Sequence, residues 1–238
     1  MGSSGLSYEI KPLLESDCLE LVKVHYRAFE KAAGDIFFTS PPSDSSYELM
    51  SRVRAKWISK SNVHAYRAVD LSSNQMLGAL VYVSNPDGVS QEKLDDETPS
   101  FEAFAPEQNE ALWRGIGKKF KECYRDYVGA RPAVEVLMLL VDPRYHRQGI
   151  GSALLDVALE EADRIGCLTY VDATDEGVRT YEKAGFKIVG NIGFDTRPFG
   201  ITKRFPVDTV GVNHDVHARC PLIYLDYDTG SQGVNLMA

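Results

Sequence analysis

The sequence predicts a mixed α/β protein that folds as a single domain. Its 238 residues are enough for one large domain with a substantial core. Strand-like and helix-like stretches follow one another from residue 8 to residue 190, and in the second half the two kinds alternate. Residues 134–165 join an apolar run, two glycines and an amphipathic stretch without a break. We therefore expect one sheet with helices packed against it.

The first part of the chain predicts a strand and two helices. Residues 8–13 form the expected strand, and Ser16 is the expected N-cap of the first helix. Apolar residues recur at helical spacing in that helix, at Leu19, Val22, Tyr26 and Phe29. Residues 34–46 are rich in serine and proline and predict a loop, and residues 47–59 predict the second helix.

A hairpin and a further helix are expected next. Residues 64–70 and 76–83 are strand-like and are separated by five mostly polar residues, which is typical of a hairpin. Residues 85–105 carry an acidic cluster among Pro, Gly and Ser, so we expect an exposed loop. A helix then opens at Pro106, with its apolar residues on one side: Leu112, Trp113, Ile116, Phe120, Tyr124 and Tyr127.

Residues 134–165 are the centre of the second half. The apolar run 136–141 is too short to cross a membrane and ends at Asp142-Pro143, so it predicts a buried strand. An amphipathic helix follows and ends at Gly166. After it we expect a strand over residues 168–173, a helix over 175–184 and a strand over 186–190.

Gly149 and Gly151 lie where the chain turns from this strand into this helix. Such glycines let the backbone approach a ligand closely and leave the first-turn N–H groups free to bind an anion, most often phosphate. The alternative is that they only permit a tight turn. A P-loop would need a lysine that the turn lacks, and a dinucleotide fingerprint would need a small residue where Leu154 stands.

Charge and cysteine content exclude several other classes. The formal net charge of −8 argues against a nucleic-acid or anionic-membrane binder and leaves room for a cationic substrate. The four cysteines are far apart, which predicts no disulfide framework, no zinc ribbon and a reducing compartment: cytoplasmic, with the nucleus left open. The spacing of His214, His217 and Cys220 matches no zinc site, so no metal is expected.

Two motifs resemble one family. Residues 139–155, which contain HRQGIGSALL after the strand, resemble the acyl-CoA-binding motif of the GNAT superfamily of N-acetyltransferases. Tyr181-Glu182-Lys183-Ala184-Gly185-Phe186 resembles that family's Tyr-x-x-x-Gly-Phe signature. The resemblance implies a mostly antiparallel central sheet flanked by helices in one domain, residues 8–190. A disordered leader, residues 1–7, would precede it, and an extension, residues 191–238, would pack on it.

The resemblance also implies a cofactor site for acetyl-CoA. The backbone of Leu139, Leu140 and Val141 would pair with the pantetheine arm. The amides of the turn would hold the pyrophosphate: Arg147, Gln148, Gly149, Ile150, Gly151 and Ser152. The family usually has Gln or Arg where this chain has His146, and often Asn where it has Thr174.

An amine acceptor sets the remaining chemistry. An alkylammonium has a pKa near 10.4, so forming the neutral amine nucleophile at pH 7 costs about 4–5 kcal/mol. A general base that takes up this proton is therefore useful. Glu135 stands where some histone-acetylating members place their base, although it could be an exposed strand-end glutamate. Asp172 is either a second base or a site for the substrate ammonium. Tyr181 matches the family's general acid for the departing thiolate, and its alternative role is packing.

The sequence thus predicts an acetyl-CoA-dependent N-acetyltransferase that acts by direct transfer in a ternary complex, as a monomer or homodimer. The acceptor would be a small-molecule or peptide amine, with no nucleic-acid or membrane partner. Acceptor specificity would lie in residues 34–46, 85–105 and 191–238. A non-catalytic acyl-CoA-binding or sensor module is the alternative, and a dinucleotide-dependent oxidoreductase is a more distant one.

Overall fold

The computed structural model describes residues 6–30, 34–96, 103–190, 192 and 194–202. Several predictions concern residues outside these ranges. Most of the predicted leader, most of the C-terminal extension and the residues His214, His217 and Cys220 lie there.

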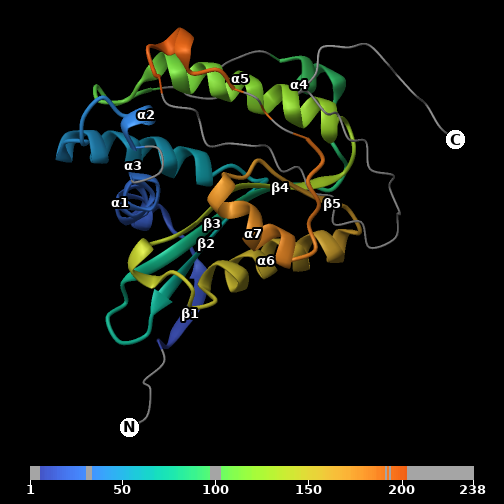
Figure 1. The fold of residues 1–238 in the computed structure, drawn as a ribbon. Helices are drawn as coiled ribbons and strands as arrows, with labels where there is room; N and C mark the ends of the chain where they lie inside the picture. Colours follow the sequence, from blue (N-terminus) through green and yellow to red (C-terminus); the bar gives the residue numbers. More distant parts are fainter. Residues whose placement is uncertain (1–5, 31–33, 97–102, 191, 193, 203–238) are drawn as a thin grey trace, which may run out of the picture.

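The described chain forms a five-stranded sheet in the order β1-β2-β3-β4-β5 (Figure 1). The first four strands pair antiparallel, and β5 pairs parallel with β4. The prediction of a mixed, mostly antiparallel sheet flanked by helices is therefore confirmed. The strands are β1 (Tyr8–Pro12), β2 (Val63–Asp70), β3 (Met76–Asn85), β4 (Ala133–Val141) and β5 (Leu168–Val171).

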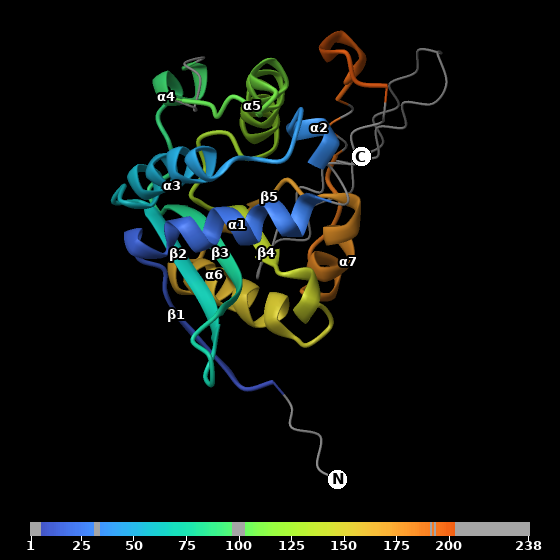
Figure 2. The same cartoon turned by 90° about the vertical axis from the view of Figure 1, so that its left-hand side faces the viewer.

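Helices cover both faces of this sheet. Figures 1 and 2 show α1, α3 and α5 on one side and α6 on the other. The helices are α1 (Cys18–Phe29), α2 (Asp35–Phe37), α3 (Asp44–Ile58), α4 (Gln91–Asp95), α5 (Glu110–Tyr127), α6 (Ile150–Ile165) and α7 (Asp175–Lys183). The described residues also form the short 3-10 turns η1 (Glu15–Asp17), η3 (Pro143–Tyr145) and η4 (Arg197–Phe199).

Helices α1, α5 and α6 bury apolar stripes against the sheet or a neighbouring helix. Leu154 and Leu155 of α6 are fully buried in a cluster with Val136 of β4. On the opposite face Leu21 of α1 packs in a cluster with Leu140. A third cluster joins α5, α2 and the end of the described chain, and its buried members are Ile36, Leu112, Ile116, Cys123, Val128, Ala133, Tyr170 and Ile192.

The predicted start of the first helix is wrong. Ser16 lies inside η1, and α1 begins two residues later, after Asp17. The Asp17 carboxylate accepts the Leu14 amide at 2.8 Å and holds this extra turn. Leu19, predicted on the apolar face, is 39% exposed, because the face that packs on the sheet includes Leu21 instead.

Three other boundaries differ from the prediction, and each involves a helix whose start is fixed by a side-chain cap. Residues 34–46 are not one loop, since they contain α2 and the start of α3, where Ser43 accepts the Ser46 amide. The predicted loop 85–105 contains α4. Helix α5 begins at Glu110 rather than at Pro106, because Asn109 caps it.

The strand predicted over residues 186–190 is absent, although all five residues are described. Phe186 is buried in the cluster that contains Leu154 and Leu155 of α6. Gly190 lies against Tyr127 of α5. A Cβ atom at Gly190 would overlap the Tyr127 hydroxyl. Tertiary packing against α5 therefore overrides the apolar pattern of this segment.

Candidate active site

Strands β4 and β5 part before β4 ends. Their parallel pairing runs from Ala133 with Leu168 to Val136 with Val171. Beyond this point β4 continues to Val141, while the segment after β5 turns away and leads into α7. In the described part of the chain, the last residues of β4 therefore have β3 on one side and a backbone edge that no strand pairs with on the other. A wedge opens between β4 and α7.

A β-bulge at Leu137 lies where the wedge begins. Tyr82 of β3 pairs with Val136 and Val81 pairs with Met138, so Leu137 has no partner on β3. A bulge bends its strand and increases the local twist, which helps β4 to part from β5. Leu137 is also 39% exposed in the interior of the sheet. The face of the sheet is therefore accessible to solvent at Leu137.

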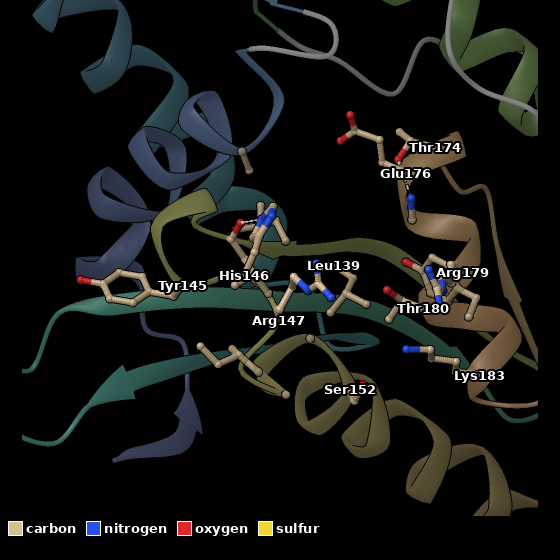
Figure 3. A pocket seen from close by; sticks show the side chains of 18 of the residues that line it. Leu139, Tyr145, His146, Arg147, Ser152, Thr174, Glu176, Arg179, Thr180 and Lys183 are labelled. Carbon is tan, nitrogen blue, oxygen red and sulfur yellow. Dashed lines mark hydrogen bonds between the residues drawn. The ribbon is translucent and has the colours of Figure 1, made fainter. Parts of the chain in front are cut away.

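The wedge holds a cavity of about 630 Å³ (Figure 3). Its walls are the end of β4, the glycine turn, the first turn of α6 and one face of α7, with Ala28 and Phe29 of α1 at one end. Every residue predicted to bind the cofactor lines it except the exposed Gln148: Leu139, Leu140, Val141, Arg147, Gly149, Ile150, Gly151 and Ser152. Tyr181 lines it as well.

The glycine turn has the backbone of an anion site. Arg147 has φ +63° and Gly149 has φ +80°, so two residues of the turn are in the left-handed region. That conformation costs a non-glycine residue about 1–2 kcal/mol, and strain of this kind is typical of functional turns. Alternating backbone conformations point successive N–H groups into one concavity, in front of the positive end of α6.

The two glycines serve different purposes. Gly149 is required by its positive φ. Gly151 has ordinary helical geometry, and a Cβ atom there would be 3.5 Å from Val141 Cγ2, a normal contact. Nothing in the described protein requires a glycine at Gly151. Its missing side chain leaves room for a ligand at the first turn of α6.

His146 closes the turn. Its Nε2 atom lies 3.0 Å from the Val141 carbonyl oxygen, and because a carbonyl can only accept, Nε2–H is the donor. The residue that departs from the family motif thus binds the protein's own backbone. One lone pair of the Val141 carbonyl is already used by this bond.

A buried carboxylate behind the turn was not predicted. Asp142 is fully buried and accepts hydrogen bonds from Arg27 of α1 and Arg144 of η3. Burial alone would raise the pKa of Asp142, but these donors hold it well below its usual value. The contact ties α1 to the turn and explains why Phe29 reaches the cavity. The sequence carries no signal for it, because Arg27 and Asp142 are far apart in the chain.

Tyr181 lies inside the cavity wall. Its ring is 5% exposed and packs against Phe186 at a centroid distance of 5.4 Å. A tyrosine hydroxyl is protonated at neutral pH, and burial raises the pKa of Tyr181 further. A protonated hydroxyl in the wall is what a proton donor requires, and the ring contact is what packing requires. Both predicted roles therefore stay open.

Glu135 and Asp172 do not line this cavity. Glu135 stands opposite Tyr170 in the pairing of β4 with β5, and the Tyr170 hydroxyl donates to Asp172 Oδ1 at 2.7 Å. Burial and the nearby Asp172 charge raise the pKa of Glu135 to about 8, partly offset by Lys93. Burial raises the pKa of Asp172 to about 7, although the Tyr170 hydrogen bond opposes the rise. Both carboxyls therefore hold their protons more tightly than an ordinary carboxyl does.

Two features are absent from the described residues. No group of three or more His, Cys, Asp or Glu among them could hold a metal ion. No described helix has the length and apolar character needed to span a membrane.

Comparison with known proteins gives a family match and one curated relative. A model described as "Acetyltransferase (GNAT) domain" matches residues 112–188, from α5 past the Tyr181–Phe186 motif. An acetyltransferase of Agrobacterium fabrum, Atu2258, is 39% identical over 66 residues, which are 27% of this chain and 48% of that protein. The chain thus matches about half the length of this relative.

Solved structures share the fold at low sequence identity. The mosquito arylalkylamine N-acetyltransferase like 5b has a TM-score of 0.58 and 17% identity, covering 87% of this chain and 97% of that one. The Drosophila melanogaster polyamine N-acetyltransferase has a TM-score of 0.58 and 15% identity, covering 87% and 98%. At this identity the likeness concerns the fold.

Proposed function

We propose, from the premise that residues 112–188 form a GNAT acetyltransferase domain, that this chain transfers an acetyl group from acetyl-CoA directly to an amine. The observation that carries the proposal is the wedge. It combines a free strand edge, an anion-binding turn and a protonated tyrosine in one cavity, and these are the three features that an acyl-CoA thioester needs.

The cofactor would enter with its diphosphate on the turn. The amides from Arg147 to Ser152 and the positive end of α6 complement its charge. The pantetheine arm carries two amide groups and would add to the edge of β4 at residues 139–141 as a further strand. A strand N–H group would then polarise the thioester carbonyl, which places the thioester deep in the wedge.

The transfer requires one bond to form and one to break. The amine nitrogen attacks the thioester carbonyl carbon, forming the C–N bond, and the C–S bond breaks to release the CoA thiolate. Tyr181 would donate a proton to that sulfur. Glu135 would accept the proton that the amine loses, directly or through water. Its pKa of about 8 makes it a stronger base than an ordinary carboxylate.

The acceptor would approach beside the bulge. Leu137 is exposed there, and Glu135 lies two residues before it on β4. Burial raises the pKa of Asp172 to about 7 against the opposing Tyr170 hydrogen bond, so part of the Asp172 population is charged at neutral pH and would bind the substrate ammonium. The two fold relatives above are named for an arylalkylamine and a polyamine, both of which are cationic amines. A cationic acceptor is part of the proposal.

Thiol release from acetyl-CoA tests this function. The amines to be tested as acceptors form a panel of an arylalkylamine, a polyamine, a peptide with a free N-terminal amine and a peptide with a lysine side-chain amine. The mass of the acetylated product is the second readout. Initial rates at varied concentrations of both substrates should give intersecting lines, as a ternary complex requires. If the protein bound acetyl-CoA but released no thiol with any amine of the panel, the result would instead support the alternative of a non-catalytic acyl-CoA-binding module.

A further inference from the structure

The cofactor cavity is positively charged although the protein is acidic. The whole chain carries a formal charge of −8. Among the described residues that line the cavity, three are permanent cations, Arg147 from the turn and Arg179 and Lys183 from α7, and one is a carboxylate, Glu176. A local excess of positive charge in a cavity of an acidic protein indicates an anionic ligand.

Arg179 and Lys183 form a pair on α7. They are four residues apart and therefore lie on one side of the helix, about 6 Å apart along its axis. Figure 3 shows both side chains on the side of α7 that faces the turn, with Arg147 extending towards them from the opposite wall. Both are exposed, and neither makes an ion pair with a carboxylate in the described part of the chain. Both side chains are therefore accessible to an anionic ligand that enters the cavity from solvent.

The turn and the α7 pair are two separate groups of donors. The turn offers backbone amides and Arg147, which is sufficient for a diphosphate. The α7 pair lies on the other wall of the wedge and offers a guanidinium fork and an ammonium, a combination that suits a terminal phosphate dianion. Coenzyme A carries both kinds of group, a diphosphate and a separate phosphate on the ribose 3′ oxygen.

We propose that Arg179 and Lys183 form a subsite for the ribose 3′-phosphate of coenzyme A. This inference rests on the proposed function, because it assumes that coenzyme A occupies the wedge. Its consequence is selectivity. The protein would bind coenzyme A more tightly than 3′-dephospho-coenzyme A, which has the same diphosphate, pantetheine and adenosine but lacks the group that the α7 pair contacts.

Calorimetric titration with these two nucleotides tests the subsite. The unaltered protein should bind coenzyme A about ten-fold more tightly than the dephosphorylated form. The variant Arg179→Ala/Lys183→Ala should lose about that factor for coenzyme A and keep its affinity for 3′-dephospho-coenzyme A. The preference of the unaltered protein should also shrink at high salt, because the pair is exposed.

A charge-matched variant serves as the control. Lys60 and Lys118 are exposed and lie outside the cavity, so Lys60→Ala/Lys118→Ala removes the same charge at a distance. This control should keep the preference for coenzyme A. Equal losses for both nucleotides in the α7 variant, or equal affinities in the unaltered protein, would overturn the subsite and leave the proposed function intact. Failure of the unaltered protein to bind either nucleotide would overturn both.

Discussion

The Arg27 guanidinium donates two hydrogen bonds to the Asp142 carboxylate, from Nε at 2.9 Å and from Nη2 at 2.8 Å, across 115 residues of sequence. Asp142 is fully buried at the end of β4, directly before the turn that lines the cavity. Its second guanidinium partner is Arg144. Helix α1 is therefore fastened to the cavity wall by a buried charge that must stay paired.

Replacement of Arg27 by alanine should lower the free energy of unfolding by about 1–2 kcal/mol at pH 7, because Asp142 keeps only Arg144. The folded protein depresses the pKa of Asp142, so the stabilisation is present above the unfolded pKa of about 3.9 and is lost as the pH falls below it. Urea unfolding at pH 7 and pH 3 should therefore show a smaller difference at pH 3. Arg197→Ala, which removes an exposed pair with Asp195, should change stability by about 0.5 kcal/mol or less.

The two glycines of the turn should respond differently to alanine. Gly149→Ala should cost about 1–2 kcal/mol of stability, because its φ of +80° is strained for any L side chain. Gly151→Ala should leave stability unchanged or slightly raised, since its Cβ atom meets only Val141 at normal distance. It should weaken acetyl-CoA binding at least about ten-fold. Thermal melts and titrations measure both effects, and a Gly151→Ala variant with unaltered affinity would contradict close ligand approach.

The rate of acetyl transfer should rise with pH through a midpoint near 8, where Glu135 loses its proton. Glu135→Gln should abolish this rise. Both proteins should be assayed with the same cationic acceptor, so that titration of the substrate amine, with a pKa near 10.4, is common to both profiles. A raised pKa also means that the folded protein holds a proton that the unfolded chain has released, so stability should fall between about pH 4 and pH 8. A Gln variant with the original profile would exclude Glu135 as the base.

Tyr181→Phe separates a proton donor from a packing residue. Loss of a general acid should lower kcat about 100-fold and leave the dissociation constant of acetyl-CoA unchanged. The ring contact with Phe186 is preserved in this variant, and the hydroxyl makes no hydrogen bond to another described residue. The melting temperature should therefore stay the same. An unchanged kcat would establish the packing role.

Much of the fold could be predicted from local patterns. The hairpin of β2 and β3, the stop of β4 before Pro143 and the cap of α6 at Gly166 all agree with the structure. The errors lie where long-range packing competes with a local pattern. Residues 186–190 are apolar enough for a strand, but they form none: Phe186 packs in the cluster beside α6, and Gly190 lies against Tyr127.

By itself the sequence determined the turn and its motif, because a left-handed glycine, a strand-ending proline and a helical stripe depend on neighbours in the chain. Tertiary structure alone decided the bulge at Leu137, the pairing of Arg27 with Asp142 and the raised pKa of Glu135. It also brought the α7 cations to face the turn. Each of these requires groups far apart in sequence to meet, and burial and charge act only once they do.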